Sequence, residues 1–278
     1  SLRAMLQLLP RDIPTRVRLP TLSRATTQLR GSVALLVGCA QSVLQPDINS
    51  ATIDVLNRNG FDVHLPRGQV CCGALSWHLG QQKQAQGFAI RNLEAFSSIG
   101  KVDAILTNAA GCGSGMHEYP LILKGTEFEQ KATEFVKGVK DVAQFLADVG
   151  LVEPLPDKAA SSTVAYHDAC HLANAQKVRD APRALLGQIP GLELKELPDS
   201  HLCCGSAGTY NLDQPEIASS LGRQKAKRVI ESGASQVATG NIGCLTQLQH
   251  HLQEQDSNVR VRHTMQVLRD AYSTTRSE

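Results

Sequence analysis

The sequence predicts an α/β protein made of two similar halves, each with a mainly parallel sheet. Apolar runs typical of strands precede the cysteines, helical periodicity fills the segments between them, and the whole pattern occurs twice at one spacing. Hydrophobic residues make up 42% of the 278 residues and charged residues 19%, so the chain can bury a core and is not expected to be disordered. No apolar run approaches the roughly 20 residues that span a bilayer.

The predicted elements alternate in the same order in both halves. Strand-like runs cover residues 33–37, 61–65 and 102–107 in the first half and residues 163–166, 192–197 and 236–239 in the second. Helical periodicity covers residues 48–59, 82–97 and 217–232. Each half therefore runs strand, cysteine, helix, strand, Cys-Cys-Gly, helix, strand, cysteine. This order predicts two tandem Rossmann-like domains, residues 31–150 and 160–278, related by a pseudo-twofold axis.

The eight cysteines form two sets with the same internal spacing. The separation is 131 residues from Cys39 to Cys170 and 132 residues from Cys112 to Cys244. The adjacent pair of each set is also 132 residues from its counterpart. The two sets are Cys39, Cys71, Cys72 and Cys112, and Cys170, Cys203, Cys204 and Cys244. Four cysteines that recur in one register indicate a duplicated ligand set rather than scattered core cysteines.

The predicted fold would bring the four cysteines of each half together. All of them follow strands, and the carboxyl ends of parallel strands lie along one edge of a sheet, where ligands bind. Helices begin at the same edge, and their positive ends favour the thiolate form. Gly73 and Gly205, which follow the adjacent pairs, allow the sharp turn that a bulky group beside the backbone would require.

The residue types favour a metal site over disulfides. A chain of this size with no secretion signal has no need of a disulfide framework. For the same reason we expect the protein in the cytoplasm, either free or peripheral on the inner face of the cytoplasmic membrane. Structural zinc commonly uses Cys-x-x-Cys knuckles, whereas a multi-iron cluster offers separate irons to adjacent thiolates. Iron–sulfur is therefore favoured; zinc, and a redox disulfide between adjacent cysteines, remain alternatives.

Histidines near the cysteines could bind the metal, hydrogen-bond to a sulfur or simply lie at the surface. They are His78, His117, His167, His171 and His201. Because three of these lie in the second half, we expect that half to hold the better iron–sulfur site. His250, His251 and His263 are predicted to lie in a polar, solvated tail.

Residues 1–30 are expected to form a basic linker or docking arm. They hold six arginines and one acidic residue, a local excess of five positive charges, together with three prolines. The segment has no interleaved aromatic residues and no nucleic-acid-binding motif, so no nucleic acid partner is expected.

The two cysteine motifs resemble the cysteine-rich (CCG) domain. The stretches that carry the resemblance are residues 36–41 (LVGCAQ), 71–75 (CCGAL), 108–113 (NAAGCG), 166–171 (YHDACH), 202–212 (LCCGSAGTYNL), 241–244 (NIGC) and 261–264 (VRHT). This domain occurs in heterodisulfide reductase, in lactate-utilisation proteins and in anaerobic glycerol-3-phosphate dehydrogenase. The chain is most similar to the C-terminal domain pair of the iron–sulfur subunit of glycolate dehydrogenase, also called glycolate oxidase.

The resemblance implies an oxidoreductase subunit that transfers electrons. A separate flavin-containing subunit would oxidise glycolate or another 2-hydroxy acid, and electrons would pass through this chain toward a quinone. The implied cofactor is one or two [4Fe-4S] clusters held by the eight cysteines, with zinc as an alternative in one site. No Gly-x-Gly-x-x-Gly follows a strand, so the flavin and the catalytic residues are expected on the partner. The alternatives are a zinc-stabilised structural or interaction module, and a D-lactate, glycerol-3-phosphate or heterodisulfide-type redox subunit.

Two departures from the family pattern refine these expectations. The glycolate subunit carries a two-cluster ferredoxin domain before this region, and no Cys-x-x-Cys-x-x-Cys run is present here. The chain is thus expected to be the C-terminal portion, or a variant without that domain. Heterodisulfide reductase motifs end in Cys-x-x-Cys, whereas here Gly115 and Gln247 stand three residues after the last cysteine of each set. Four ligands per half fit a four-ligand cluster better than the five-thiolate cluster of that enzyme.

Overall fold

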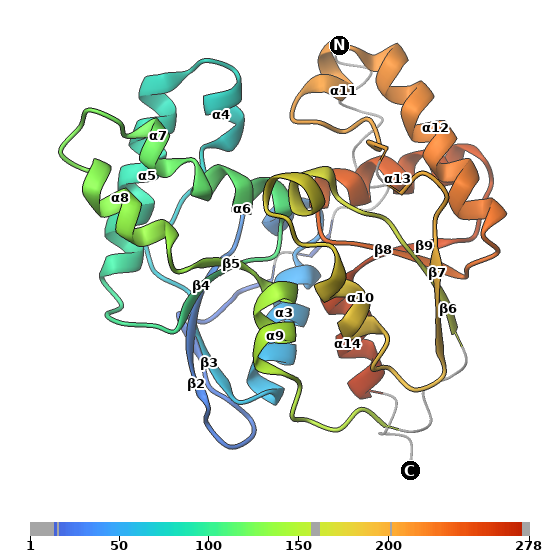
Figure 1. Cartoon of the computed structure of the whole chain (residues 1–278), viewed down its shortest axis with the longest axis horizontal. Helices are drawn as coiled ribbons and strands as arrows, with labels where there is room; N and C mark the ends of the chain where they lie inside the picture. The colour runs from blue at the N-terminus through green and yellow to red at the C-terminus, as the bar shows by residue number, and fades with distance from the viewer. Residues whose placement is uncertain (1–13, 16, 157–161, 201, 274–278) are drawn as a thin grey trace. The chain divides into compact units, whose positions relative to one another are not determined.

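The computed structural model describes residues 14, 15, 17–156, 162–200 and 202–273 (Figure 1). They divide into two compact units, one within residues 15–154 and one that comprises residue 14 and residues within 155–278. Each unit contains a largely parallel sheet with helices, and the predicted α/β class is confirmed. The domain limits 31–150 and 160–278 and the pseudo-twofold axis stay predictions.

The first unit has a five-stranded sheet in the order β1-β3-β2-β4-β5. The strands are β1 (Leu22–Ser23), β2 (Gly31–Leu36), β3 (Phe61–His64), β4 (Ala104–Thr107) and β5 (Val139–Asp141). The helices are α2 (Cys39–Leu44), α3 (Asp47–Arg58), α4 (Ala74–His78), α5 (Gln82–Ser97), α6 (Ala110–His117), α7 (Tyr119–Ile122), α8 (Glu129–Val136) and α9 (Val142–Val149). All neighbouring strands pair in parallel except β1, which runs antiparallel to β3 at the edge.

The second unit has a four-stranded, fully parallel sheet in the order β7-β6-β8-β9. The strands are β6 (Ser162–Tyr166), β7 (Leu192–Glu196), β8 (Gln236–Thr239) and β9 (Arg260–His263). A π-helical turn, η1 (His171–Ala175), and the helices α10 (Asp180–Leu186), α11 (Tyr210–Asp213), α12 (Pro215–Glu231), α13 (Ile242–Glu254) and α14 (Thr264–Ser273) complete it.

The two sheets repeat one topology. The order β3-β2-β4-β5 in the first unit matches β7-β6-β8-β9 in the second, so both read 2-1-3-4 along the chain. In the first unit the chain places β3 on one side of β2 and then β4 on the other side, so the order of strand addition reverses between β2 and β4. In the second unit the same reversal lies between β6 and β8. In open α/β sheets ligands bind beyond the carboxyl ends of the strands at such a reversal, so each unit presents one predicted binding edge.

The pattern of apolar residues explains why these segments form strands and helices. The side chains of residues 33–36 in β2 are almost fully buried, as expected for a central parallel strand. Helix α5 buries Ala85, Ala89, Leu93 and Phe96, which recur at the three- and four-residue spacing of one helical face. These residues pack into a core that also includes Cys72, so the core of the first unit reaches its cysteine site.

The sequence patterns missed the fourth parallel strand of each sheet. Strand β5 has only three residues, and β9 contains Arg260, Arg262 and His263, which are atypical of a buried strand. The prediction of a solvated tail was wrong for His251 and His263, because α13 and β9 bury both side chains. His251 hydrogen-bonds to Glu254 at 2.7 Å.

Part of the predicted basic arm packs against the first unit. Arg24 forms an ion pair of 2.7 Å with Asp62, whose carboxylate also accepts a 2.8 Å bond from the Ala25 backbone N–H. This backbone bond, and Arg24, lower the pKa of Asp62 against the opposing effect of burial. Residues 1–13 and 16 of the arm lie outside the described residues.

Among the helices of the described residues, none combines the length and the apolar character needed to span a bilayer.

Candidate metal centres

The first cysteine set gathers at the predicted sheet edge. Cys39 begins α2, the adjacent pair Cys71–Cys72 lies between β3 and α4, and Cys112 lies in the first turn of α6. The sulfurs of Cys39 and Cys71 are 3.4 Å apart. The thiol of Cys72 interacts with both Cys71 and Cys112. Four cysteines from three separate segments of the chain therefore form one row of contacting sulfurs.

The second set has the same arrangement. Cys170 directly precedes η1, Cys203 and Cys204 lie in the loop after β7, and Cys244 lies in the first turn of α13. Cys170 contacts Cys203, and Cys204 contacts both Cys203 and Cys244. The structure therefore unites each predicted set; that the eight cysteines bind metal stays a prediction.

The second set is the more deeply buried of the two. Cys204 and Cys244 are buried, whereas the first set has one buried member, Cys72, and one exposed member, Cys39. Backbone and side-chain N–H groups point at the sulfurs: Gly205 donates to Cys203 at 3.3 Å and Asn241 to Cys244 at 3.5 Å. Such donors stabilise thiolates, the form that binds metals.

The sulfurs of the second set cannot all ionise without a compensating cation. Hydrogen bonds from Cys170 and Cys204 lower the pKa of Cys203. A hydrogen bond from Cys204 lowers the pKa of Cys244, whereas Cys204, which bonds to Cys203 and Cys244 and is buried, has a raised pKa. Thiolates this close together repel, so ionisation of one sulfur in the row disfavours ionisation of its neighbours. A metal ion or an iron cluster would supply the positive charge that lets all four bind as thiolates; the residues fit such a group.

Glycines at positive φ turn the backbone beside both adjacent cysteine pairs. Gly73 has φ 85° and Gly205 has φ 90°, as the sequence suggested. A Cβ at position 205 would lie 2.4 Å from the Ala218 carbonyl oxygen, whereas a Cβ at position 73 would meet no atom closer than 3.3 Å. The second turn therefore has less room than the first.

We expect Gly205→Ala to destabilise the protein more than Gly73→Ala. Both substitutions force an L-residue into the left-handed region, which costs about 1–2 kcal/mol of stability. Only Gly205→Ala also adds a clash with the backbone. Thermal melts of the metal-free variants beside wild type should show the larger loss of Tm for Gly205→Ala. Equal losses would contradict the difference in packing.

Asn92 on α5 holds the loop of the first set in place. Its amide donates to the Cys71 carbonyl at 3.0 Å and to the Tyr119 hydroxyl at 2.9 Å, and its oxygen accepts from the Val70 N–H at 2.9 Å. The side chain is fully buried. Sequence reasoning missed Asn92, because nothing in a helical pattern marks one polar position as an anchor for a distant loop.

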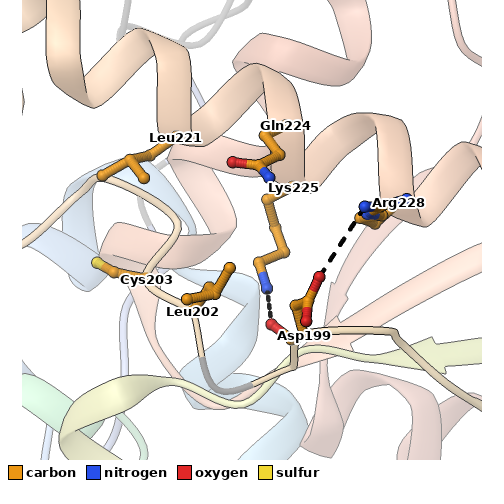
Figure 2. A pocket seen from close by; sticks show the side chains of 7 residues that line it. All are labelled: Asp199, Leu202, Cys203, Leu221, Gln224, Lys225 and Arg228. Carbon is orange, nitrogen blue, oxygen red and sulfur yellow. Dashed lines mark hydrogen bonds and ion pairs between the residues drawn. The ribbon is translucent and has the colours of Figure 1, made fainter.

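Lys225 on α12 lies beside the loop that carries the adjacent pair of the second set. Figure 2 shows its amine reaching the Asp199 carbonyl, a bond of 2.7 Å, in a small pocket that Cys203 also lines. Desolvation lowers the pKa of Lys225, and the Cys204 sulfur opposes this. With 3% of its surface exposed, Lys225 is a buried amine close to the sulfurs of Cys203 and Cys204. Sequence reasoning missed it as well.

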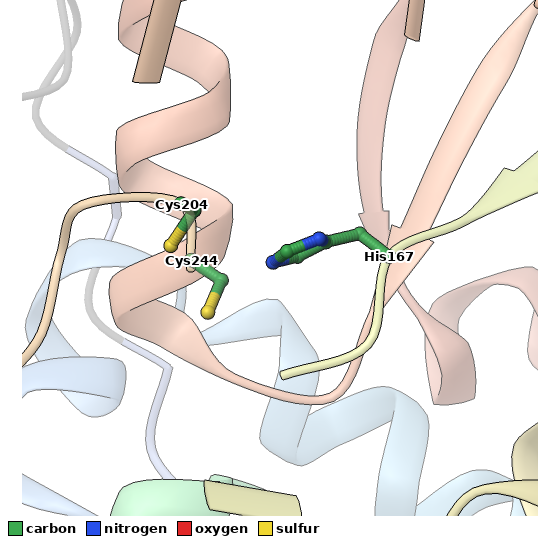
Figure 3. A group of neighbouring side chains, drawn as sticks. All are labelled: His167, Cys204 and Cys244. Carbon is green, nitrogen blue, oxygen red and sulfur yellow. The ribbon is translucent and has the colours of Figure 1, made fainter. Parts of the chain in front are cut away.

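The histidines proposed as ligands differ in their surroundings. His78 is 3.0 Å from Glu118 at the surface. His117 is also exposed, and partial desolvation lowers its pKa. The His171 Nδ1 lies 3.5 Å from the Cys170 sulfur. His167 is buried with its ring toward Cys204 and Cys244 (Figure 3). His201 lies outside the described residues.

Comparison with protein-family models matches the cysteine-rich domain (CCG) twice, at residues 33–117 and 164–249. The "Probable glycolate oxidase iron-sulfur subunit" of Bacillus subtilis is 33% identical over 94% of this chain and 59% of its own length. The "Glycolate oxidase iron-sulfur subunit" of Escherichia coli is 36% identical over 86% of this chain and 58% of its own length. The chain thus spans less than two thirds of these relatives.

A third relative is matched over nearly its full length. "Lactate utilization protein A" of Oceanobacillus iheyensis is 30% identical over 85% of this chain and 96% of its own length. Among solved structures, a hypothetical protein from Helicobacter pylori has a TM-score of 0.63 at 11% identity, covering 97% of this chain and 53% of that one. At this identity the likeness concerns the fold alone.

Proposed function

Because this chain belongs to the cysteine-rich (CCG) domain family, we propose that it is an iron–sulfur electron-transfer subunit of a flavin-dependent 2-hydroxy-acid dehydrogenase of the glycolate oxidase type. Its partners would be a flavin-containing subunit that oxidises the substrate and an acceptor on the quinone side. Names of the relatives from Bacillus subtilis, Escherichia coli and Oceanobacillus iheyensis support this class of activity.

The observation that carries the proposal is the presence of two rows of four contacting cysteine sulfurs, one at the switch-point edge of each sheet. Four thiolates match the four irons of a [4Fe-4S] cluster, and adjacent cysteines can each bind a different iron. When bound, the cluster would accept and donate single electrons. The chain's part is to hold the thiolates, shield them from water and set the local charge.

Anaerobic purification followed by iron, sulfide and zinc analysis tests the proposal. We expect iron and inorganic sulfide in equal amounts, together with visible absorbance that dithionite bleaches. Matched variants with all four cysteines of one set replaced by serine would assign the metal to each site. A colourless protein that holds zinc alone would overturn the proposal in favour of a zinc-stabilised module.

Lys225→Met is expected to lower the midpoint potential of the second site and leave the first unchanged. The buried cation stabilises the more negative, reduced state of a nearby cluster, so its removal favours the oxidised state. Redox titration monitored by electron paramagnetic resonance measures the shift. Lys227→Met, on the exposed face of the same helix, is the control, and an equal shift in both variants would contradict a specific effect of Lys225.

A further inference from the structure

We infer that His167 is a fifth ligand side chain of the second site, which binds the metal or cluster through a ring nitrogen beside Cys204 and Cys244. This inference rests on the proposed function for the identity of the group bound. It assigns to the second unit a mixed nitrogen and sulfur donor set, and to the first unit sulfur alone.

The burial of His167 is the first observation. Only 1% of its surface is exposed, and within the described part of the chain neither ring nitrogen has a nitrogen or oxygen hydrogen-bond partner. The ring interacts instead with the Cys244 sulfur. A buried imidazole without nitrogen or oxygen partners loses the hydrogen bonds it makes in water, at a cost of about 1–3 kcal/mol. A bound metal would remove much of this cost.

The position of the ring is the second observation. A ring nitrogen of His167 and the sulfurs of Cys204 and Cys244 all lie within 4.8 Å of one another. Figure 3 shows the ring extending from the end of β6 toward both sulfurs. The neighbouring Asp168 points elsewhere, because its carboxylate accepts bonds of 2.8 and 2.9 Å from Arg183. The imidazole faces sulfur, and among the described residues no carboxylate hydrogen-bonds to it.

The duplicated sheet provides the third observation. In the first unit Leu36 pairs with Thr107. In the second, Tyr166 pairs with Ala238, and the next residue, His167, donates its N–H to the Ala238 carbonyl at 2.9 Å. His167 thus stands opposite Thr239, at the position that Leu36 has in the first unit. Leu36 is buried to the same extent, so the fold at this point accepts an apolar side chain and does not itself require histidine.

The chemistry of imidazole suits this place. A neutral ring nitrogen binds iron and zinc alike, and histidine replaces cysteine as a ligand in some iron–sulfur proteins. Since Cys204 and Cys244 are the most buried sulfurs of the set, a neutral donor beside them adds a ligand without adding negative charge to a low-dielectric site.

Protein labelled with ¹⁵N-histidine and prepared anaerobically gives a direct test. In the reduced, paramagnetic state, pulsed electron paramagnetic resonance should detect the strong hyperfine coupling of a directly bound ¹⁵N nucleus. This coupling should be lost in His167→Leu, which copies Leu36, and in His167→Gln, and should be retained in His171→Leu. Absence of strong coupling in the wild type, or its persistence in both His167 variants, would overturn the inference. Thermal melts check that the variants fold.

A second measurement separates this inference from the proposed function. If iron and sulfide are absent, the proposed function fails, and Co²⁺ titration of the metal-free 278-residue chain then tests His167 by itself. We expect His167→Leu to weaken Co²⁺ binding at the second site by more than about 10-fold and to change the ligand-field spectrum. His250→Leu, which replaces a histidine that pairs with Glu254 on α13, should leave both unchanged at this site. Equal affinity and spectra in wild type and His167→Leu, or no Co²⁺ binding at all, would overturn it.

Discussion

Cys204→Ser is expected to remove the metal of the second site and to leave the first site loaded. Only 1% of the Cys204 surface is exposed, and its thiol lies between those of Cys203 and Cys244, so its loss opens the centre of the ligand row. A serine hydroxyl is a poor substitute for a thiolate on iron. Iron and sulfide per chain, measured anaerobically, should fall by the content of one site, and the paramagnetic signal of the other should remain.

Two further variants make this result specific. Cys72→Ser, at the matching place in the first set, should remove the other signal and spare the second. His78→Ala replaces a partly exposed histidine that pairs with Glu118 and should leave the iron content unchanged. An iron content in Cys204→Ser equal to that of wild type would contradict the ligand assignment.

The purified chain is expected to oxidise no glycolate or lactate with an artificial dye, and to accept electrons when its flavin partner is present. In the proposed function, this chain supplies only the two metal sites, and the flavin-containing subunit oxidises the substrate. Mixed with the flavin-containing subunit, any ferredoxin-like domain of the complex and glycolate, it should lose cluster absorbance within the time of flavin reduction. Stopped-flow absorbance measures this step.

A variant with both cysteine sets replaced by serine is the control for electron transfer. It should bind the partner without being reduced. Turnover of a 2-hydroxy acid by the isolated wild-type chain would contradict the proposal, as would equal electron transfer through the complex when both sets are replaced.

The sequence predicted the fold well where one physical signal dominates. The continuous apolar run at residues 33–37 matches β2, and the periodic segment at residues 82–97 matches α5. Strand β9 was missed because Arg260 and Arg262 flank a single valine, so its parallel pairing with β8 outweighs the local composition. Local propensity gives no indication of such pairing.

Prediction of the sites had a similar limit. The repeated spacing divided the eight cysteines into two sets and predicted the sheet edge at which each set gathers, because topology converts sequence intervals into proximity. Spacing could not distinguish His167 from His78 or His117, since their difference is one of orientation and burial. Lys225 was missed because a lysine in a polar helix is usually exposed, and only the tertiary structure shows that its amine is buried.

The unequal exposure of the two sulfur rows has a consequence for how the protein tolerates air. Cys39 is exposed, whereas Cys204 and Cys244 are buried, and oxidants attack accessible thiolates first. Oxygen would therefore damage the first site before the second. A preparation handled in air would retain metal in only one unit, and its stoichiometry would suggest a single-cluster protein unless the sample had been kept anaerobic from the start.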